Sequence, residues 1–100
     1  MTAVADKLRE ARALIERGWT RHISTRDGRF CAVGAVAHVT PLIRDRERQL
    51  RRDCFDILKH ATCKQTISGV AAWNDRQKSK KPVLAAFDKA ILLAEQETVR

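Results

Sequence analysis

Residues 40–60, TPLIRDRERQLRRDCFDILKH, form the best-defined amphipathic stretch of the sequence. Thr40 followed by Pro41 is typical of a helix start, because threonine caps free backbone N–H groups and proline fits the first helical position. At about 3.6 residues per turn, one face then collects five apolar residues, which are Ile43, Leu50, Cys54, Ile57 and Leu58. We therefore expect a helix from Thr40–Pro41 to Lys59 or His60, with this face against a hydrophobic core.

Helical periodicity also marks the segments before this stretch. Apolar residues recur at helical spacing from Val4 to Ile15, and Gly18 provides a stop. The apolar run 31–39, CAVGAVAHV, favours a closely packed helix, because strands prefer branched and aromatic residues to alanine and glycine. Between these segments, Asp27-Gly28 predicts a tight turn.

Two further helices are expected after the long one. Residues 67–73 predict a short helix, and a last helix begins near Pro82. The sequence has no internal repeat and no linker, and 100 residues suit one domain. We predict an all-α fold, a compact bundle of four to five helices with a short hairpin-like loop near residues 20–30. The whole chain, residues 1–100, is expected to form this single helical domain.

The composition is strongly basic, with 20 Lys and Arg against 12 Asp and Glu and a net charge of +8. This excess favours an acidic partner, either an acidic protein surface or nucleic acid, although it lies at the upper end of what small soluble domains carry. No apolar run approaches the roughly 20 residues that span a bilayer, and no secretory signal is recognisable. Three cysteines without a C-x-x-C pair predict free thiols in a reducing compartment. We expect a cytoplasmic protein without membrane contact, and the oligomeric state stays open.

The basic residues gather in two clusters. Four arginines lie on one flank of the long predicted helix, and four more cations precede the last helix; they are Arg44, Arg48, Arg51 and Arg52, then Arg76, Lys78, Lys80 and Lys81. Guanidinium groups on one helix flank could contact a phosphate backbone or an acidic protein surface. The small number of aromatic residues disfavours a base-stacking RNA platform. The first hypothesis is therefore a basic binding module, and the alternative is a merely solvated basic face.

Cys31 is the one candidate catalytic residue. It is expected to begin the short apolar helix, and the N-terminus of a helix favours the nucleophilic thiolate. The candidate bases are His22, His38 and His60, but His38 lies about 10 Å along the same helix. Packing as a small apolar residue explains Cys31 equally well. The alternative function is thus a small cysteine-dependent enzyme centred on Cys31, and we expect a non-enzymatic protein.

No cofactor or metal is predicted. The four glycines are scattered and form no phosphate-binding loop. Cys54, His60 and Cys63 lie within ten residues but match none of the common zinc spacings. The sequence therefore favours a binding module over an enzyme.

Two motifs, Cys-x-x-Gly-Ala and Trp-Asn-Asp, belong to a set of segments that resembles a known family. The segments are Leu8-Arg9-Glu10-Ala11, Gly18-Trp19-Thr20, FCAVGA at 30–35, Ala72-Trp73-Asn74-Asp75 and Val83-Leu84 with Phe87-Asp88-Lys89-Ala90-Ile91. They are similar to a family of small uncharacterised bacterial and phage proteins, a domain of unknown function. The resemblance covers residues 7–94 and implies a shared fold without supplying an activity.

The resemblance also implies where a site would lie. If the two motifs meet around Trp19, the site residues are Trp19, Cys31, Trp73, Asn74 and Asp75. The alternative is that Asn74 and Asp75 only close a helix, as such residues commonly do. A phage-type origin, by analogy alone, would suit a modulator of a larger complex.

Overall fold

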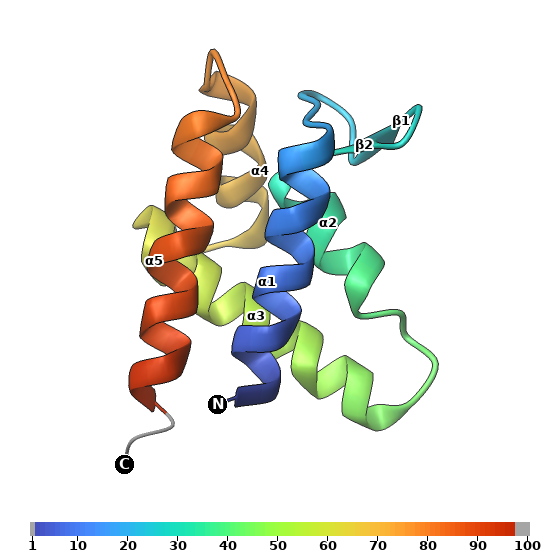
Figure 1. Ribbon diagram of the computed structural model, residues 1–100, viewed down its shortest axis with the longest axis vertical. Helices are drawn as coiled ribbons and strands as arrows, with labels where there is room; N and C mark the ends of the chain where they lie inside the picture. The colour runs from blue at the N-terminus through green and yellow to red at the C-terminus, as the bar shows by residue number, and fades with distance from the viewer. Residues whose placement is uncertain (1, 98–100) are drawn as a thin grey trace.

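The computed structural model describes residues 2–97, which form five helices and a short hairpin (Figure 1). The helices are α1 (Thr2–Arg17), α2 (Ala32–Val39), α3 (Asp45–Thr62), α4 (Ile67–Arg76) and α5 (Lys81–Glu97). Strands β1 (Thr25–Arg26) and β2 (Arg29–Phe30) pair antiparallel around Asp27 and Gly28, which both have positive φ. The all-α bundle and the hairpin near residues 20–30 are therefore confirmed.

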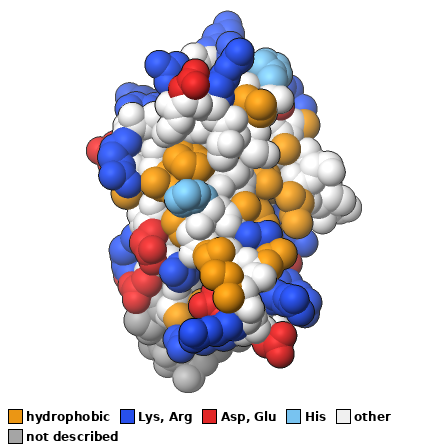
Figure 2. Space-filling view, turned by 90° about the vertical axis from the view of Figure 1, so that its right-hand side faces the viewer, with side chains coloured by type: hydrophobic (Ala, Val, Ile, Leu, Met, Phe, Trp, Pro, Cys, Tyr) orange, Lys and Arg blue, Asp and Glu red, His pale blue; other side chains and the backbone are white. Residues whose placement is uncertain are grey.

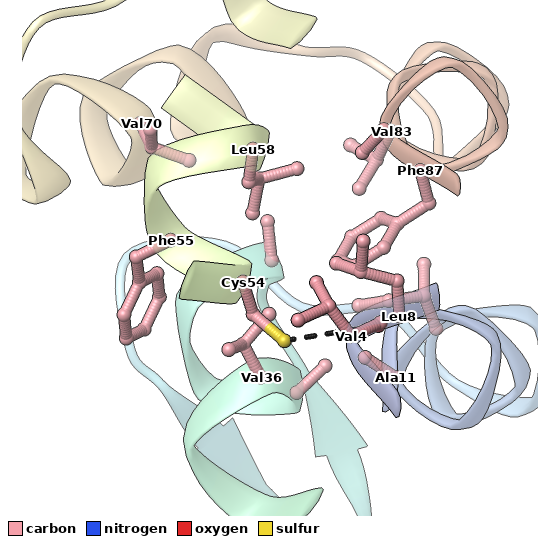
Figure 3. Packing of buried hydrophobic residues seen from close by; sticks show 14 of the residues in the cluster. Val4, Leu8, Ala11, Val36, Cys54, Phe55, Leu58, Val70, Val83 and Phe87 are labelled. Carbon is pink, nitrogen blue, oxygen red and sulfur yellow. Dashed lines mark hydrogen bonds between the residues drawn. The ribbon is translucent and has the colours of Figure 1, made fainter. Parts of the chain in front are cut away.

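The core lies between α1, α3 and α5, with α2 and α4 closing its remaining sides (Figure 3). Leu8 of α1, Leu58 of α3 and Phe87 of α5 are completely buried there. Burial of each such side chain contributes about 1.5–3 kcal/mol of transfer free energy. Helical periodicity thus identified the elements that build the core. None of the described helices is long and apolar enough to cross a membrane.

Cys54 belongs to this core, as its place on the apolar stripe predicts. Its side chain is fully buried, and its Sγ donates a weak hydrogen bond of 3.9 Å to Val4 O (Figure 3). Burial raises the pKa of the Cys54 thiol to about 12, because a thiolate would lose its hydration in the core. Cys54 therefore stays protonated and packs as a small apolar residue.

The prediction that Thr40 and Pro41 begin the long helix is wrong. Thr40 instead ends α2, where its N–H and its hydroxyl both donate to Val36 O, at 3.2 and 2.6 Å. A hydroxyl committed to the preceding helix cannot cap the next one, and α3 begins only at Asp45, with Arg44 as its N-cap. Ile43, expected on the buried face, lies before the helix and is 77% exposed.

Candidate functional site

Asn74, on α4, is fully buried and connects three segments of the chain. Its Oδ1 accepts hydrogen bonds from Trp19 Nε1 (2.8 Å) and from the backbone N–H of Ala32 (3.1 Å). Its Nδ2 donates to Thr20 O (3.2 Å) and to Asp75 Oδ1 (3.2 Å). An amide side chain has two donors and two acceptor positions, so Asn74 uses all four. This buried amide fixes the segment after α1 and the start of α2 against α4.

Cys31 lies at the start of α2, as the sequence predicted, and acts as its N-cap. Its Sγ accepts a hydrogen bond of 3.2 Å from Gly34 N, and its own N–H donates to Ser24 O at 3.0 Å. A Cβ atom at Gly34 would lie only 2.1 Å from Ser24 O. The Cys-x-x-Gly spacing therefore does two things at once: it caps the helix and admits the 20–24 segment against it.

His22 joins this group through Asp75. Its backbone has φ of +69°, a conformation that is uncommon for residues other than glycine. The His22 N–H donates a 2.7 Å hydrogen bond to Asp75 Oδ1, and the ring Nδ1 lies 3.8 Å from Asp75 Oδ2. The Asp75 carboxylate thus holds the unusual His22 backbone in place, while the His22 ring is 73% exposed.

A pocket of about 330 Å³ lies beside the Asn74 hydrogen-bond unit, at the end of the molecule that carries the hairpin. Its walls come from the 20–24 segment, the start of α2 and the end of α4, and its lining residues are His22, Ile23, Ser24, Cys31, Val33, Ala71 and Asp75. Four of the five expected site residues lie together here: Cys31 and Asp75 line the pocket, and Trp19 and Asn74 belong to the hydrogen-bond unit beside it. Trp73 does not line the pocket; it is partly buried and packs against the hydrophobic core.

Of the three candidate bases, only His22 shares a pocket with Cys31. His38 is exposed on α2, with its ring 4.9 Å from that of Phe30. His60 lines a shallow hollow at the C-terminal end of α3, together with the exposed Cys63. Helical spacing already disfavoured His38, but the sequence could not choose between His22 and His60, because that choice depends on the tertiary contact between His22 and α4.

The arginines of α3 do not act as one flank. Arg51 turns back onto the C-terminal end of α2, where its Nη2 donates to Ala37 O (2.8 Å) and its Nε to Thr40 O (3.0 Å). It thereby satisfies carbonyl groups that the end of a helix leaves free. Arg48 pairs with Asp45 at 3.5 Å, in an exposed position. Arg51 is therefore a structural cap, a role that no helical-wheel argument would show.

A groove of about 490 Å³ runs along α3 toward the start of α4. Apolar side chains of Leu42, Phe55 and Ile67 line it, and its charged residues are Arg48, Arg51, Arg52, Asp56 and Lys59. Leu42 is 51% and Ile67 42% exposed, which is high for side chains of this kind. Figure 2 views the side of the molecule that carries α2 and the loop before α3, and in its lower half hydrophobic side chains alternate with Lys and Arg. We call the groove lined by the eight residues named above, from Leu42 to Ile67, the α3 groove.

The second predicted basic cluster lies elsewhere. Arg76, Lys78, Lys80 and Lys81 occupy the connection between α4 and α5, which Figure 1 shows at the opposite end of the bundle from the start of α3. Lys80 Nζ donates to Glu16 O, at 2.6 Å, which fastens this connection to the end of α1. Arg21 also lies here, since its Nη1 donates to Gln77 O at 3.0 Å. The structure therefore does not unite the two basic clusters.

A family model described as a family of unknown function, DUF6197, matches residues 1–93. The chain belongs to this family. Comparisons with curated proteins and with solved structures found no match. All residues of the Asn74 hydrogen-bond unit, of the adjacent pocket and of the α3 groove lie within the part of the chain that the DUF6197 model matches. Among residues 2–97, no group of three or more His, Cys, Asp or Glu side chains could hold a metal ion.

Proposed function

We propose that this DUF6197 protein is a small basic binding module that engages an acidic, amphipathic protein segment through the α3 groove. The observation that carries the proposal is the exposure of Leu42 and Ile67 between cationic side chains. Exposed apolar side chains rimmed by polar residues are a common mark of an interaction site.

Charge complementarity argues for an acidic occupant. Arg48, Arg52 and Lys59 border the apolar floor, and Asp56 is the one acidic residue that lines the groove. Asp56 is also paired with Lys59, at 3.1 Å. The protein as a whole carries a net charge of +8, which would steer acidic partners toward it and would repel a second copy of the chain.

The apolar floor favours a protein segment over nucleic acid. A phosphate backbone is bound chiefly through charge, and a basic stripe of several side chains is its usual footprint. Here Arg51 is occupied by α2, and the cluster around Lys78 lies at the other end of the bundle. An amphipathic helix with acidic residues on one face and apolar anchors on the other would match both properties of the groove.

Such binding would suit a small protein that occupies an acidic docking segment of a larger complex. We propose that the protein acts in the cytoplasm as a modulator of this kind, in line with the bacterial or phage origin that the sequence motifs suggest. Masking one acidic segment requires no catalytic group, so the proposal stands apart from any chemistry at Cys31.

The test is fluorescence anisotropy with a labelled helix-forming peptide that carries Leu and Phe at i, i+4 and i+7 and Glu elsewhere. We expect saturable binding that Arg52→Glu weakens about tenfold, equivalent to about 1.4 kcal/mol. Leu42→Ser is expected to weaken binding by a similar factor, because it removes an apolar contact. Lys78→Glu is the matched control, since it makes the same change in net charge away from the groove, and it should leave the affinity within about twofold.

Two outcomes would contradict the proposal. Equal losses for Arg52→Glu and Lys78→Glu would show that only net charge matters. Binding of duplex DNA, single-stranded DNA or RNA that displaces the peptide and weakens log-linearly with salt would identify the basic surface as a nucleic-acid interface.

A further inference from the structure

The pocket beside Asn74 combines a thiol, an imidazole and apolar walls. The binding proposed for the α3 groove does not involve it. Cys31 comes from the start of α2, while His22 comes from the loop after α1. Ile23, Val33 and Ala71 supply apolar surface between them. Two separate segments thus bring a nucleophile and a base to one cavity, and α4 supplies part of its wall.

The Cys31 side chain is held in one orientation at the wall of this pocket. The hydrogen bond from Gly34 N fixes the direction of Sγ. Cys31 lines the pocket and is 5% exposed. The backbone N–H of Val33, in the first turn of α2, has no acceptor within residues 2–97. A free N–H at this point could receive the negative charge that develops on a carbonyl oxygen.

His22 can serve the thiol as a base. Asp75 anchors its backbone with a 2.7 Å hydrogen bond, while the ring is 73% exposed and not held by a hydrogen bond of its own. Its Nδ1 lies 3.8 Å from Asp75 Oδ2, and His22, Asp75 and Cys31 all line the same pocket. An imidazole can accept and return a proton near neutral pH, and hydrogen bonds to a catalytic thiol commonly tighten only with substrate bound.

We propose that Cys31 accepts acyl groups from small esters or thioesters, with His22 as the general base. Cys31 Sγ bonds to the carbonyl carbon as its proton passes to His22, and the bond to the leaving oxygen or sulfur breaks. The proton on His22 then goes to the leaving group. Water attacks the resulting Cys31 thioester, which restores the thiol and releases the acid, so the overall reaction is hydrolysis.

The pocket indicates the size of the acyl group. Its volume of about 330 Å³ lies at the small end of ligand pockets, which span roughly 300–1,000 Å³. The aliphatic walls favour a short, uncharged chain over a bulky or charged one. A substrate of the acetyl or propionyl type is therefore expected, and the proposal does not depend on the α3 groove.

The experiment treats the full chain with p-nitrophenyl acetate near neutral pH and follows p-nitrophenolate release and acetylation of each cysteine by mass spectrometry. Cys63 and Cys54 are internal references, because the first is exposed and the second is buried. We expect Cys31 to be acetylated faster than Cys63. Cys31→Ser keeps a side chain that can cap α2. It should abolish the release of p-nitrophenolate that accompanies acetylation of Cys31.

His22→Asn is the decisive variant, since asparagine tolerates positive φ well. It should slow acetylation of Cys31 about a hundredfold, the scale of general-base catalysis. His60→Asn is the matched control and should not change this rate. The proposal is overturned if Cys31 reacts no faster than Cys54, if it reacts more slowly than Cys63, or if the two histidine variants behave alike.

Discussion

Asn74 offers the sharpest test of how the fold is held together, because its amide uses both donors and both acceptors. Asn74→Asp keeps the shape and the Oδ1 acceptor for Trp19 Nε1 and Ala32 N. It replaces the donor Nδ2 by an oxygen that faces two other acceptors, Thr20 O and Asp75 Oδ1, each 3.2 Å from Nδ2 in the native protein. The substitution therefore converts two attractive contacts into repulsive ones without changing volume.

The expected loss is large for a protein of this size. Each buried polar group left without a partner costs about 1–3 kcal/mol, so two lost donors correspond to about 2–6 kcal/mol. The total free energy of unfolding of a small domain is only about 5–15 kcal/mol. We therefore expect Asn74→Asp to be the most damaging isosteric change in the chain, and to recover partly at low pH as the introduced carboxyl gains a proton and can donate again.

Urea unfolding followed by tryptophan fluorescence measures this loss, since the Trp19 indole is itself a partner of Asn74. Gln77→Glu is the matched control: it makes the same chemical change on a residue whose Nε2 donates one hydrogen bond, to Trp73 O. It should cost about 1 kcal/mol. An Asn74→Asp variant within 1 kcal/mol of the parent protein, or one no less stable than Gln77→Glu, would refute the reasoning.

Three further predictions follow from single contacts. Gly34→Ala should destabilise by about 1–3 kcal/mol or more, because its Cβ would lie 2.1 Å from Ser24 O, whereas Gly69→Ala meets no backbone atom so close; chemical denaturation of both variants tests this. Arg51→Ala should cost about 1.5–3 kcal/mol in the same assay, since it removes charged hydrogen bonds to the last carbonyls of α2, and a neutral result would show that Arg51 is only a surface residue. Burial raises the pKa of the Cys54 thiol from 9.0 to about 12, so the thiol ionises at a lower pH in the unfolded protein than in the folded one. Its contribution to the free energy of unfolding is therefore intact below pH 9 and falls by about 1.4 kcal/mol per pH unit as the pH rises from 9 toward 12. Cys54→Ala should lack that alkaline slope, and identical slopes for both proteins would contradict the buried, protonated state.

Periodicity predicted the helices because it reports which residues face the core, and that information is local. It placed Leu50, Cys54 and Leu58 on one face of α3, and Cys54 and Leu58 are indeed fully buried. It failed at Thr40, where one hydroxyl could cap the following helix or end the preceding one. The second option wins because α2 is already stabilised by packing, and its terminal carbonyls then need donors. Composition cannot express that competition between neighbouring elements.

The candidate site was predictable as a set of residues and not as a geometry. The sequence motifs predicted that Cys31, Asn74 and Asp75 meet around Trp19, but the contact from the backbone N–H of Ala32 to Asn74 leaves no pattern in the sequence. The sequence disfavoured His38 but left His22 and His60 open, because only the tertiary contact between His22 and Asp75 distinguishes them. The α3 groove could not be predicted from the sequence, because it depends on the exposure of Leu42 and Ile67. That exposure depends in turn on where the helices begin.

Around Asn74, the side chain that holds the fold differs from the side chains that carry the proposed chemistry, so mutations can separate the two roles. Asn74 holds the pocket through four hydrogen bonds, none of which involves the Cys31 thiol or the His22 ring. Replacing Asn74 should therefore destabilise the pocket and the fold together. Replacing His22 or changing Cys31 to serine should remove only the chemistry, because serine still caps α2 and Asp75 still accepts from the backbone of residue 22. A variant set that shows loss of acetylation with unchanged stability at Cys31 and His22, and loss of both at Asn74, would establish that the pocket is a reactive site built on a structural hydrogen-bond unit.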